Sequence, residues 1–404
     1  MNESRPIKAR RPSDRREQIS ANARELFVER GFHSVRMSDI AEVTGITSRA
    51  LYRHYANKQA LLSHVLFEAQ AAFLAALPEY QADADPGALA GTLRDMASAS
   101  LAERNMARLW RREARHIDAE GSRVLRGRLN DLALRLANMI RARHPGLTEA
   151  EVLVRAWAVI AIVNSHEESA GLFDQGQTAR LLGAAALAAV DAERGEQAAE
   201  ETASGMPRTG QRRVSVSRRE QLLAIAAGTF RRSGFDGASV DGIAMEAGIA
   251  GPAIYRYFES KTEMLVAISD RFREWVSLET IRALRAAASD TGALGGLIAG
   301  YVKLAAEAED LLSVTVTEAH HLPSGAAERL ARARTERSQE WAHWTRAIRQ
   351  DRSEAATQLL VNTAQVVVDD LARTPRVMHA DGATDALTSV ATAILRDTDT
   401  RPSR

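Results

Sequence analysis

The sequence of 404 residues contains no cysteine, which excludes a disulfide scaffold, a thiolate zinc finger, an iron–sulfur cluster and a cysteine nucleophile. Long apolar runs are also missing. The longest, residues 156–163 and 184–190, are far shorter than the roughly 18 residues that a membrane-spanning helix requires. The first residues are basic but lack the apolar core of a signal peptide. We therefore expect a cytoplasmic protein without a membrane segment.

Catalytic and nucleotide-binding signatures are missing as well. The sequence has no nucleophile elbow, no GxxxxGKS/T phosphate loop, no GxGxxG motif after a strand and no HExxH metal motif. His320 and His321 are adjacent, so their side chains would diverge on a helix, and no third metal ligand is evident. We predict that the chain is not an enzyme and holds no metal or cofactor.

The near-neutral total charge conceals an uneven distribution. The chain has 53 basic and 52 acidic residues, for a formal net charge of +1. Residues 1–65 carry 12 basic and 7 acidic side chains, and residues 205–268 carry 9 and 6. The remaining residues are acidic on balance. Two basic segments separated by acidic ones are the distribution expected of a protein that contacts phosphate through two of its parts.

A long internal repeat organises the chain. Residues 15–65 align with residues 218–268 without a gap, and 18 of the 51 positions are identical. A repeat this wide indicates a duplicated protein and not a solenoid of short units. We predict five segments, which are a first head with a basic arm (1–65), a first body (66–191), a linker (192–217), a second head (218–268) and a second body (269–398).

The fold class is predicted to be all-α. Both bodies are rich in Ala, Leu, Arg and Glu, with apolar residues three or four positions apart, whereas alternating strand patterns are nearly absent. In the first head, Ile19, Ala23, Leu26 and Phe27 share one helical face, and Gly31 follows as a helix-terminating glycine.

The first head has the pattern of a helix-turn-helix. Ser38 is expected to cap a second helix, Gly45 to break it, and Thr47 or Ser48 to cap a third helix that runs to about Tyr55. Two short helices joined by a tight glycine-containing turn form a helix-turn-helix, whose second helix enters the DNA major groove.

Both heads closely resemble the DNA-binding domain of the TetR family of bacterial repressors. The resemblance covers about 102 residues, and the strength of the match lies in the whole string at fixed spacing, found twice. The carrying residues of the first head are Gly31-Phe32, Ile40-Ala41, Gly45-Ile46, Leu51-Tyr52-Arg53-His54-Tyr55, Lys58 and Leu61-Leu62. Those of the second head are Gly234-Phe235, Ile243-Ala244, Gly248-Ile249, Ile254-Tyr255-Arg256-Tyr257-Phe258, Lys261 and Leu265.

The residue types in these positions suit contact with double-stranded DNA. Arg49 can bond guanine bidentately, Tyr52 can offer its hydroxyl to a phosphate, and Lys58 has an amide and an ammonium for another phosphate. The predicted DNA-contacting residues of the first head are Ser38, Thr47, Ser48, Arg49, Tyr52, Arg53, His54 and Lys58. Those of the second head are Gly251, Pro252, Tyr255, Arg256, Tyr257 and Lys261.

The two heads differ where the recognition helix begins. The first has Thr47-Ser48-Arg49, whereas the second has Ala250-Gly251-Pro252 and so lacks the arginine and both hydroxyls. We expect the second head to contact DNA differently, more through its tyrosines, Arg256 and apolar contact.

A basic arm precedes each head. The arms contain Arg5, Lys8, Arg10 and Arg11 before the first head, and Arg208, Arg212 and Arg213 before the second. Such arms either enter a minor groove or remain solvated tails, and the sequence leaves both readings open.

The family resemblance implies that each body is a helical ligand-binding and dimerisation domain, in which a small molecule shifts the spacing of the heads. Several apolar, aromatic and polar residues of the bodies are candidates for lining a ligand cavity, and they would suit a lipophilic or acyl-type effector. Alternatively, these residues fill an ordinary helical core. These candidates are Met106, Trp110, Glu113, His116, Trp157, Glu318, His320, Trp341 and Trp344.

The last helices of each body are the candidates for pairing. They are predicted at about 149–174 with 177–193, and at about 352–373 with 383–397. The resemblance implies a four-helix interface, made either within one chain as a pseudo-dimer or between two chains as a homodimer. A linker of about 25 residues reaches roughly 25–30 Å, so both arrangements are feasible. Unequal heads on one chain would suit an asymmetric operator.

Two functions of different classes follow. The first is a ligand-responsive, sequence-specific transcriptional regulator, in particular a repressor that a small molecule releases from its operator. The alternative is a DNA-binding or scaffold protein that has no small-molecule effector and is controlled by a protein partner. A cavity in the bodies would favour the first.

Overall fold

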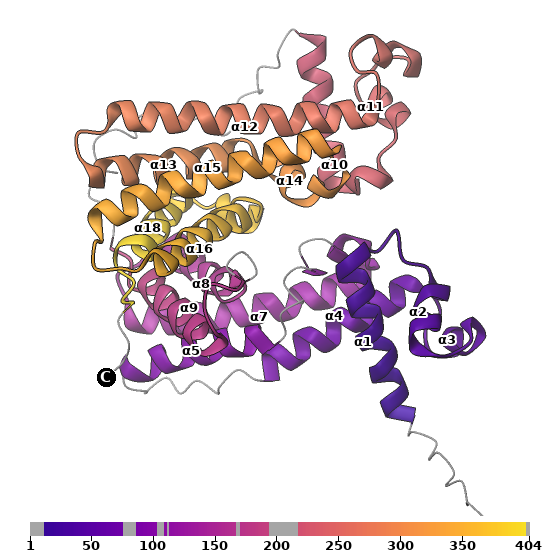
Figure 1. Cartoon of the computed structure of the whole chain (residues 1–404), viewed down its shortest axis with the longest axis horizontal. Coiled ribbons are helices and arrows are strands. Elements are labelled where there is room, and N and C mark those ends of the chain that lie inside the picture. The colour runs from indigo at the N-terminus through magenta and orange to yellow at the C-terminus, as the bar shows by residue number, and fades with distance from the viewer. Residues whose placement is uncertain are drawn as a thin grey trace, which may run out of the picture. The chain divides into compact units, whose positions relative to one another are not determined.

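The computed structural model describes residues 12–75, 86–102, 109–110, 113–166, 170–193 and 217–400. These residues form helices, turns and loops, with no strand among them (Figure 1). The all-α prediction is confirmed. The chain divides into two compact units, one made of residues 1–78 and 102–132 and the other of residues 79–101 and 133–404. No helix in the described ranges combines the length and the apolarity that crossing a membrane requires.

The first unit contains the first head. Its helices are α1 (Pro12–Arg30), α2 (Met37–Thr44), α3 (Ser48–His54) and α4 (Lys58–Ala75), joined by η1 (Ala114–His116) and the first part of α7 (Ala119–Arg143). The helix ends follow from local chemistry. Gly31 and Gly45 take φ angles of 80° and 67°, the left-handed conformation that glycine adopts most easily.

One hydrophobic core holds this head together. The predicted face of α1, which includes Ile19 and Phe27, is buried, as are Ile40 on α2 and Leu51 on α3. Each short helix therefore presents its opposite face to solvent. Because Leu51 is the buried residue of α3, the polar side of this helix is available for a partner.

The second unit contains the second head, the second body and the last helices of the first body. Its elements are α5 (Pro86–Ala102), the last part of α7, α8 (Glu149–Val163), α9 (Gln175–Val190), α10 (Arg218–Gly237), α11 (Val240–Glu246), η4 (Gly251–Arg256), α12 (Lys261–Ala286), α13 (Asp290–Glu307), α14 (Glu309–Thr317), η5 (Ala319–His321), α15 (Ser324–Ile348), α16 (Glu354–Ala372), α17 (Pro375–Met378) and α18 (Ala383–Arg396).

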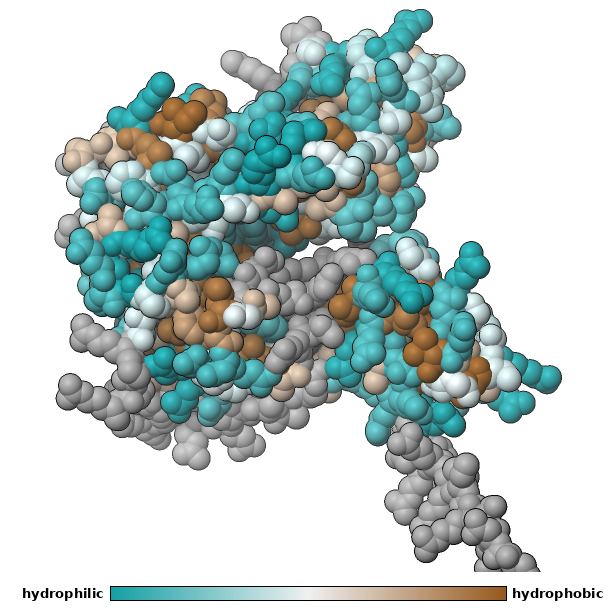
Figure 2. Space-filling model, viewed as in Figure 1, coloured by the Kyte–Doolittle hydropathy of each residue, from teal (hydrophilic) through white to brown (hydrophobic). Residues whose placement is uncertain are grey.

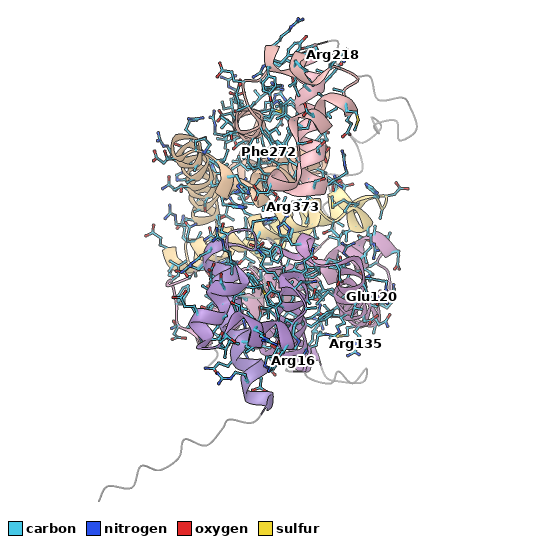
Figure 3. All side chains as sticks on the ribbon, turned by 90° about the vertical axis from the view of Figure 1, so that its right-hand side faces the viewer. Arg16, Glu120, Arg135, Arg218, Phe272 and Arg373 are labelled. Atoms are coloured by element: carbon cyan, nitrogen blue, oxygen red, sulfur yellow. The ribbon has the colours of Figure 1, made fainter. Side chains whose placement is uncertain are left out.

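The long helix α12 joins the second head to its body. Arg218, at the start of α10, lies at the surface, whereas Phe272 on α12 is buried among the helices (Figure 3). The outer side of α12 carries three partly exposed apolar residues, Trp275, Leu278 and Ile281, and hydrophobic side chains are visible on the surface of this part in Figure 2. The predicted head–body boundaries at 65/66 and 268/269 fall inside α4 and α12, so each of these helices belongs to both head and body.

Helices from the two halves of the chain pack together within the second unit. The pair α8 and α9 contacts α16 and α18. Ser165, just after α8, and Thr363 on α16 are fully buried, and their hydroxyl oxygens lie 3.1 Å apart. The predicted ranges of these helices agree with the structure except that α8 ends at Val163.

A buried arginine stabilises the end of the last helix in each half. Arg155 donates to the carbonyls of Val190 and Ala192 at 2.7 Å. Arg352 donates to the carbonyls of Leu395, Arg396 and Thr398, the last at 2.6 Å. Each guanidinium satisfies carbonyls at a helix C-terminus, where the helix dipole also favours a cation.

Candidate nucleic-acid interface and ligand cavity

The recognition helix of the first head is built around a side-chain cap. The Thr47 hydroxyl accepts a hydrogen bond from the Ala50 amide at 3.2 Å, and this confirms Thr47 as the cap of α3. Ser48, Arg49 and Tyr52 are exposed on the helix that follows, with Tyr52 at 53%. The structure thus brings the predicted base-reading side chains together at one outward end of the head.

Arg53 and His54 complete this helix. Arg53 is exposed and His54 is half-buried. Both stand in the last turn of α3, where cations are favoured by the helix dipole. The Arg53 guanidinium therefore places positive charge beside the exposed residues Ser48, Arg49 and Tyr52.

The prediction that Ser38 caps α2 is wrong. The helix begins one residue earlier, at Met37, so Ser38 lies inside its first turn. The carboxylate of Asp39 performs the capping, because it accepts a hydrogen bond from the Arg36 amide at 2.9 Å. This bond is the main cause of the lowered pKa of Asp39. Ser38 remains exposed, with its hydroxyl 3.2 Å from Asp39.

The ammonium of Lys58, predicted to be available to a phosphate, is bonded within its own head. The Nζ atom donates to the carbonyls of Phe32 and Val35 at 2.6 and 2.7 Å and lies 4.3 Å from the centre of the Phe32 ring. Burial lowers the pKa of this ammonium. The lysine instead ties α4 to the turn after α1, while its position as the first residue of α4 still places its amide at a helix N-terminus.

Lys261 repeats this arrangement in the second head. Its Nζ atom donates to the carbonyls of Phe235 and Ala238 at 2.7 and 3.0 Å and lies 4.3 Å from the centre of the Phe235 ring. The ammonium of Lys261, a residue predicted to contact DNA, is therefore also bonded within its own head.

The recognition segment of the second head is a 3₁₀ helix. It spans Gly251–Arg256, with Pro252 in its first turn, and no side chain caps it. The carboxylate of Asp241 occupies the place where a Cβ atom on residue 251 would stand. A larger residue at this position would displace that carboxylate.

The exposed surface of the second head is more apolar than that of the first. Tyr255 and Tyr257 are 55% and 37% exposed, Met245 is 78% exposed, and Arg256 is exposed beside them. Asp241 places a negative charge at the start of the recognition segment, where the first head has hydroxyls. A carboxylate there disfavours an approaching phosphate.

His116, which is predicted together with Glu113 to bind a ligand, packs against the first head. The His116 ring stacks on Phe32 with centroids 5.1 Å apart and meets the edge of His33 at 4.4 Å. Glu113 is 3% exposed and lies 3.7 Å from His116 Nε2. Their contacts therefore connect the body segment η1 to the turn after α1.

The second half repeats this contact with Glu318 and His321. The Glu318 carboxylate is fully buried and accepts a hydrogen bond from the Phe235 amide at 3.0 Å. His321 stacks on the Phe235 ring with centroids 4.7 Å apart. The sequence interpretation chose His320 and missed His321. The segments Glu113-Ala114-Arg115-His116 and Glu318-Ala319-His320-His321 are similar, and in them His116 corresponds to His321. We call each group of these residues a head–body latch.

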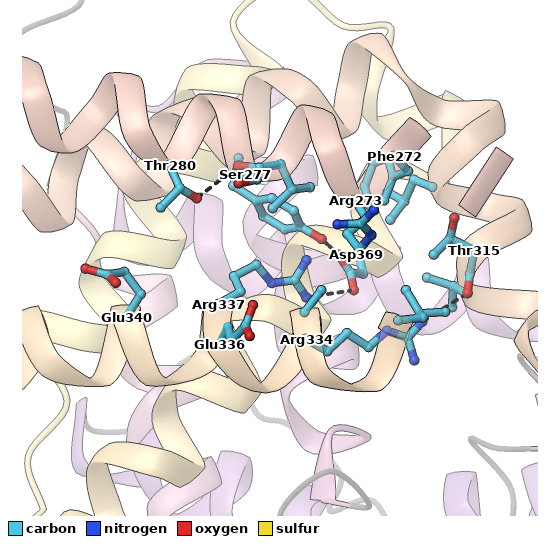
Figure 4. Close-up of a pocket in the computed structure, with 16 residues that line it drawn as sticks. Phe272, Arg273, Ser277, Thr280, Thr315, Arg334, Glu336, Arg337, Glu340 and Asp369 are labelled. Atoms are coloured by element: carbon cyan, nitrogen blue, oxygen red, sulfur yellow. Dashed lines mark hydrogen bonds and ion pairs between the residues drawn. The ribbon is translucent and has the colours of Figure 1, made fainter. Parts of the chain in front are cut away.

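A cavity of about 190 Å³ lies in the second body, between α12, α13, α14, α15 and α16 (Figure 4). Its polar end contains Tyr301, Arg273, Arg337 and Asp369. The Tyr301 hydroxyl donates to Asp369 Oδ1 at 2.5 Å, and the Arg337 guanidinium lies 4.3 Å from the centre of the Tyr301 ring. No motif in the sequence pointed to these residues, because they come from four separate helices.

None of the predicted ligand-binding residues lines this cavity. Trp341 is buried behind it, edge-on to Tyr301 at 5.9 Å, and Trp344 donates to the lining residue Glu340 at 2.7 Å. In the first body, Trp110 packs partly buried against the core of the head, and Trp157 is half-buried on α8. Met106 and both basic arms lie outside the described residues.

The heads and bodies define a class of protein. Two helix-turn-helix heads, each with an exposed recognition segment and each followed by helices, are the architecture of a DNA-binding regulatory protein. A family model described as "Bacterial regulatory proteins, tetR family" matches residues 19–65 and again residues 222–268. The chain therefore contains two DNA-binding domains of the TetR type in tandem.

Curated relatives match over the DNA-binding domain. The chain is 37% identical over 76 residues to the HTH-type transcriptional activator FasR from Mycolicibacterium smegmatis, a segment that is 19% of this chain and 35% of that protein. It is 38% identical over 64 residues to the HTH-type transcriptional regulator UidR from Escherichia coli K12, which is 16% of this chain and 33% of that protein. The matches thus span about a third of each relative.

Solved structures of the same family also align with the chain. A TetR-family transcriptional regulator from Bordetella parapertussis aligns with a TM-score of 0.43 and 17% identity, over 45% of this chain and 96% of its own. The TetR-family transcriptional regulator PfmR from Thermus thermophilus aligns with a TM-score of 0.39 and 20% identity, over 43% of this chain and 97% of its own.

Proposed function

We propose that the chain is a ligand-responsive, sequence-specific transcriptional repressor that a small molecule releases from its operator. The observation that carries the proposal is the exposed face of Ser48, Arg49 and Tyr52 on a capped α3, at the outer end of a head that is closed by its own core. The cavity in the second body supports a small-molecule effector over control by a protein partner alone.

The two heads are proposed to contribute unequally. The first reads bases through Arg49, and the second adds backbone and apolar contacts through Tyr255, Arg256 and Tyr257. The support is the difference between an α-helical and a 3₁₀ recognition segment, together with the carboxylate of Asp241 at the start of the latter. An operator with two unequal half-sites follows from this asymmetry.

Pairing of the two halves is proposed to occur within one chain. The contacts of α8 and α9 with α16 and α18, and the buried Ser165–Thr363 contact, support this pseudo-dimer. In such an arrangement the covalent linker makes the effective concentration of each half at the other high, so the two heads act together without a second chain.

DNA binding to the region upstream of the protein's own coding sequence tests the proposal. Arg49→Ala is expected to relax the preference at one base pair by about 1–3 kcal/mol, and Tyr255→Ala to weaken binding without changing the preferred sequence. Lys303→Ala, an exposed change on α13, is the control. Unchanged affinity for Tyr255→Ala would show that the second head is idle. A footprint of two identical half-sites would contradict the asymmetric operator.

A further inference from the structure

The cavity in the second body has two chemically different ends. Its apolar wall is formed by Phe272, Val276, Leu312, Val316 and Leu330. The polar end is formed by arginines from opposite helices, Arg273 on α12 and Arg337 on α15, which approach Asp369 from two sides (Figure 4). An occupant that satisfies both ends must therefore be amphipathic.

Arg337 lacks acceptors at the polar end. Its side chain is 11% exposed, and its nearest carboxylate oxygen, on Asp369, is 3.9 Å from Nη2, too far for a hydrogen bond. Its Nε atom is buried and has no hydrogen-bond partner among the described residues. A buried guanidinium without acceptors is costly, and oxygen atoms of an anion in the cavity would remove that cost.

Arg273 contributes a second buried donor without a hydrogen-bond partner. Its Nε atom is buried without a hydrogen bond in the described part of the chain, although Asp270 Oδ1 lies 3.5 Å away. Thr315, which also lines the cavity and is 3% exposed, has a hydroxyl that bonds to no described residue. Three buried polar groups thus line one cavity with unused bonding capacity.

The Asp369 carboxylate does not satisfy the hydrogen-bond donors of Arg337. Its Oδ1 atom already accepts the Tyr301 hydroxyl at 2.5 Å. Burial raises the pKa of Tyr301 far above its ordinary value, so the hydroxyl keeps its proton and donates to the carboxylate. The other charged residues of the lining are Arg334, Glu336 and Glu340, of which Arg334 and Glu336 are exposed and Glu340 accepts a hydrogen bond from Trp344. The guanidinium groups of Arg273 and Arg337 therefore lie near a carboxylate that is already hydrogen-bonded, and their buried Nε donors remain for the oxygen atoms of an anionic ligand.

We infer that this cavity binds a small amphipathic monoanion, namely a short-chain carboxylate. Its carboxylate oxygens accept hydrogen bonds from Arg337 and Arg273, and its alkyl chain lies along Phe272, Val276 and Leu312. The cavity volume of about 190 Å³ is below the roughly 300–1,000 Å³ of sites for drug-sized ligands, which selects a short chain. The inference rests on the proposed effector role of this cavity.

Calorimetric titration of the full chain without DNA tests the ligand class. The probes are butanoate, hexanoate, octanoate and decanoate, with the alcohols and primary amines of matching length, and hexyl phosphate as a dianion. We expect carboxylates to bind at least about tenfold more tightly than the matching alcohols, because charge-assisted hydrogen bonds are the stronger ones. Equal binding of alcohols, or tighter binding of amines or of hexyl phosphate, overturns the inference.

Variants test the site. Arg337→Met and Arg273→Met each remove a charge while keeping an unbranched chain, and each is expected to weaken carboxylate binding about tenfold or more. Arg346→Met is the matched control, since Arg346 also lies on α15, pairs with Glu354 and does not line the cavity. If Arg337→Met fails to fold, Arg273→Met decides. Carboxylate binding of wild-type strength in the folded variants contradicts the inference. If a carboxylate binds but does not release the protein from DNA, the inference stands and the proposed function is contradicted.

Discussion

At the scale of single residues, Lys58 and Lys261 show that one side chain has the same structural task in both heads. Each ammonium bonds the carbonyls of the turn after the first helix of its head and lies 4.3 Å from the centre of a phenylalanine ring. The motif identified both lysines, but spacing alone does not reveal which way an ammonium points. Its partners lie more than 20 positions earlier in the chain.

Lys58→Met is expected to destabilise the first head by about 2 kcal/mol, because charged hydrogen bonds to the carbonyls of Phe32 and Val35 are lost. Urea unfolding measures this loss. Lys303→Met, an exposed change on α13, is the control and should be neutral. If the ammonium instead contacts a phosphate, Lys58→Met will leave the free energy of unfolding unchanged. It will then reduce the slope of log DNA affinity against log salt concentration by about one.

At the scale of elements, the head–body latches connect each recognition head to the helices that follow it. In the second half, Glu318 on the turn after α14 holds the Phe235 amide, and His321 covers the Phe235 ring. The helix α14 also lines the cavity through Leu312, Thr315 and Val316. We therefore expect a shift of α14 on ligand binding to reach the turn that Lys261 holds.

Glu318→Gln is expected to preserve the fold and to weaken this coupling, since an uncharged amide replaces the buried carboxylate that accepts from Phe235. The measurement is the ratio of DNA affinities with and without effector, which should fall toward one while effector affinity is retained. Glu113→Gln in the first half is the matched variant. A ratio that stays at the wild-type value in Glu318→Gln would remove the latch from the mechanism.

An ion pair between α10 and α12 adds a pH-dependent contact to the second head. Arg271 donates to both carboxylate oxygens of Glu220, at 2.6 and 3.0 Å. Its hydrogen bonds hold the pKa of Glu220 below the ordinary value of a glutamate. Because the folded state favours the ionised form, this stabilisation is present above the ordinary glutamate pKa and is lost as pH falls through the lowered pKa.

Glu220→Gln is therefore expected to lower the free energy of unfolding at pH 7 by about 0.5–1 kcal/mol, a value discounted because the carboxylate is about a third exposed. The difference between Glu220→Gln and the wild type should disappear at a pH below the lowered pKa. Urea midpoints at several pH values measure it. A difference that persists unchanged in acid would assign the stabilisation to packing instead of charge.

At the scale of the whole molecule, the duplication changes what a dimer interface requires. Helices α8 and α9 of the first half contact α16 and α18 of the second half, and the Ser165–Thr363 contact lies fully buried there. The same chain therefore supplies both sides of a four-helix contact. Because the two halves are separate parts of one sequence, each can change independently of the other. Their recognition segments differ accordingly, one being α-helical and the other a 3₁₀ helix.

The chain is expected to be monomeric in solution, with a mass near 44.0 kDa by light scattering coupled to size exclusion. A protease site inserted between residues 194 and 216 provides the complementary measurement, since the two halves should stay associated after cleavage. A species of twice the mass at low concentration would show that pairing occurs between chains. Separation of the cleaved halves would likewise contradict intra-chain pairing.

The helices, the duplication and the exposed residues at the start of α3 were predictable from the sequence. The glycine at 31, the turn at 45 and the cap at 47 were predicted from the sequence, because turn conformation and capping depend on residues a few positions apart. The misplaced cap at Ser38 is the exception, since the nearby Asp39 competes for the same role.

The position of the cavity and the contacts between each head and its body depend on tertiary packing. Tyr301 meets Asp369 across 68 positions, and Glu318 meets Phe235 across 83. Such contacts depend on how helices cross, and no local pattern encodes that crossing. The sequence interpretation therefore placed the ligand among residues that do not line the cavity, whereas packing brings arginines from separate helices around this space.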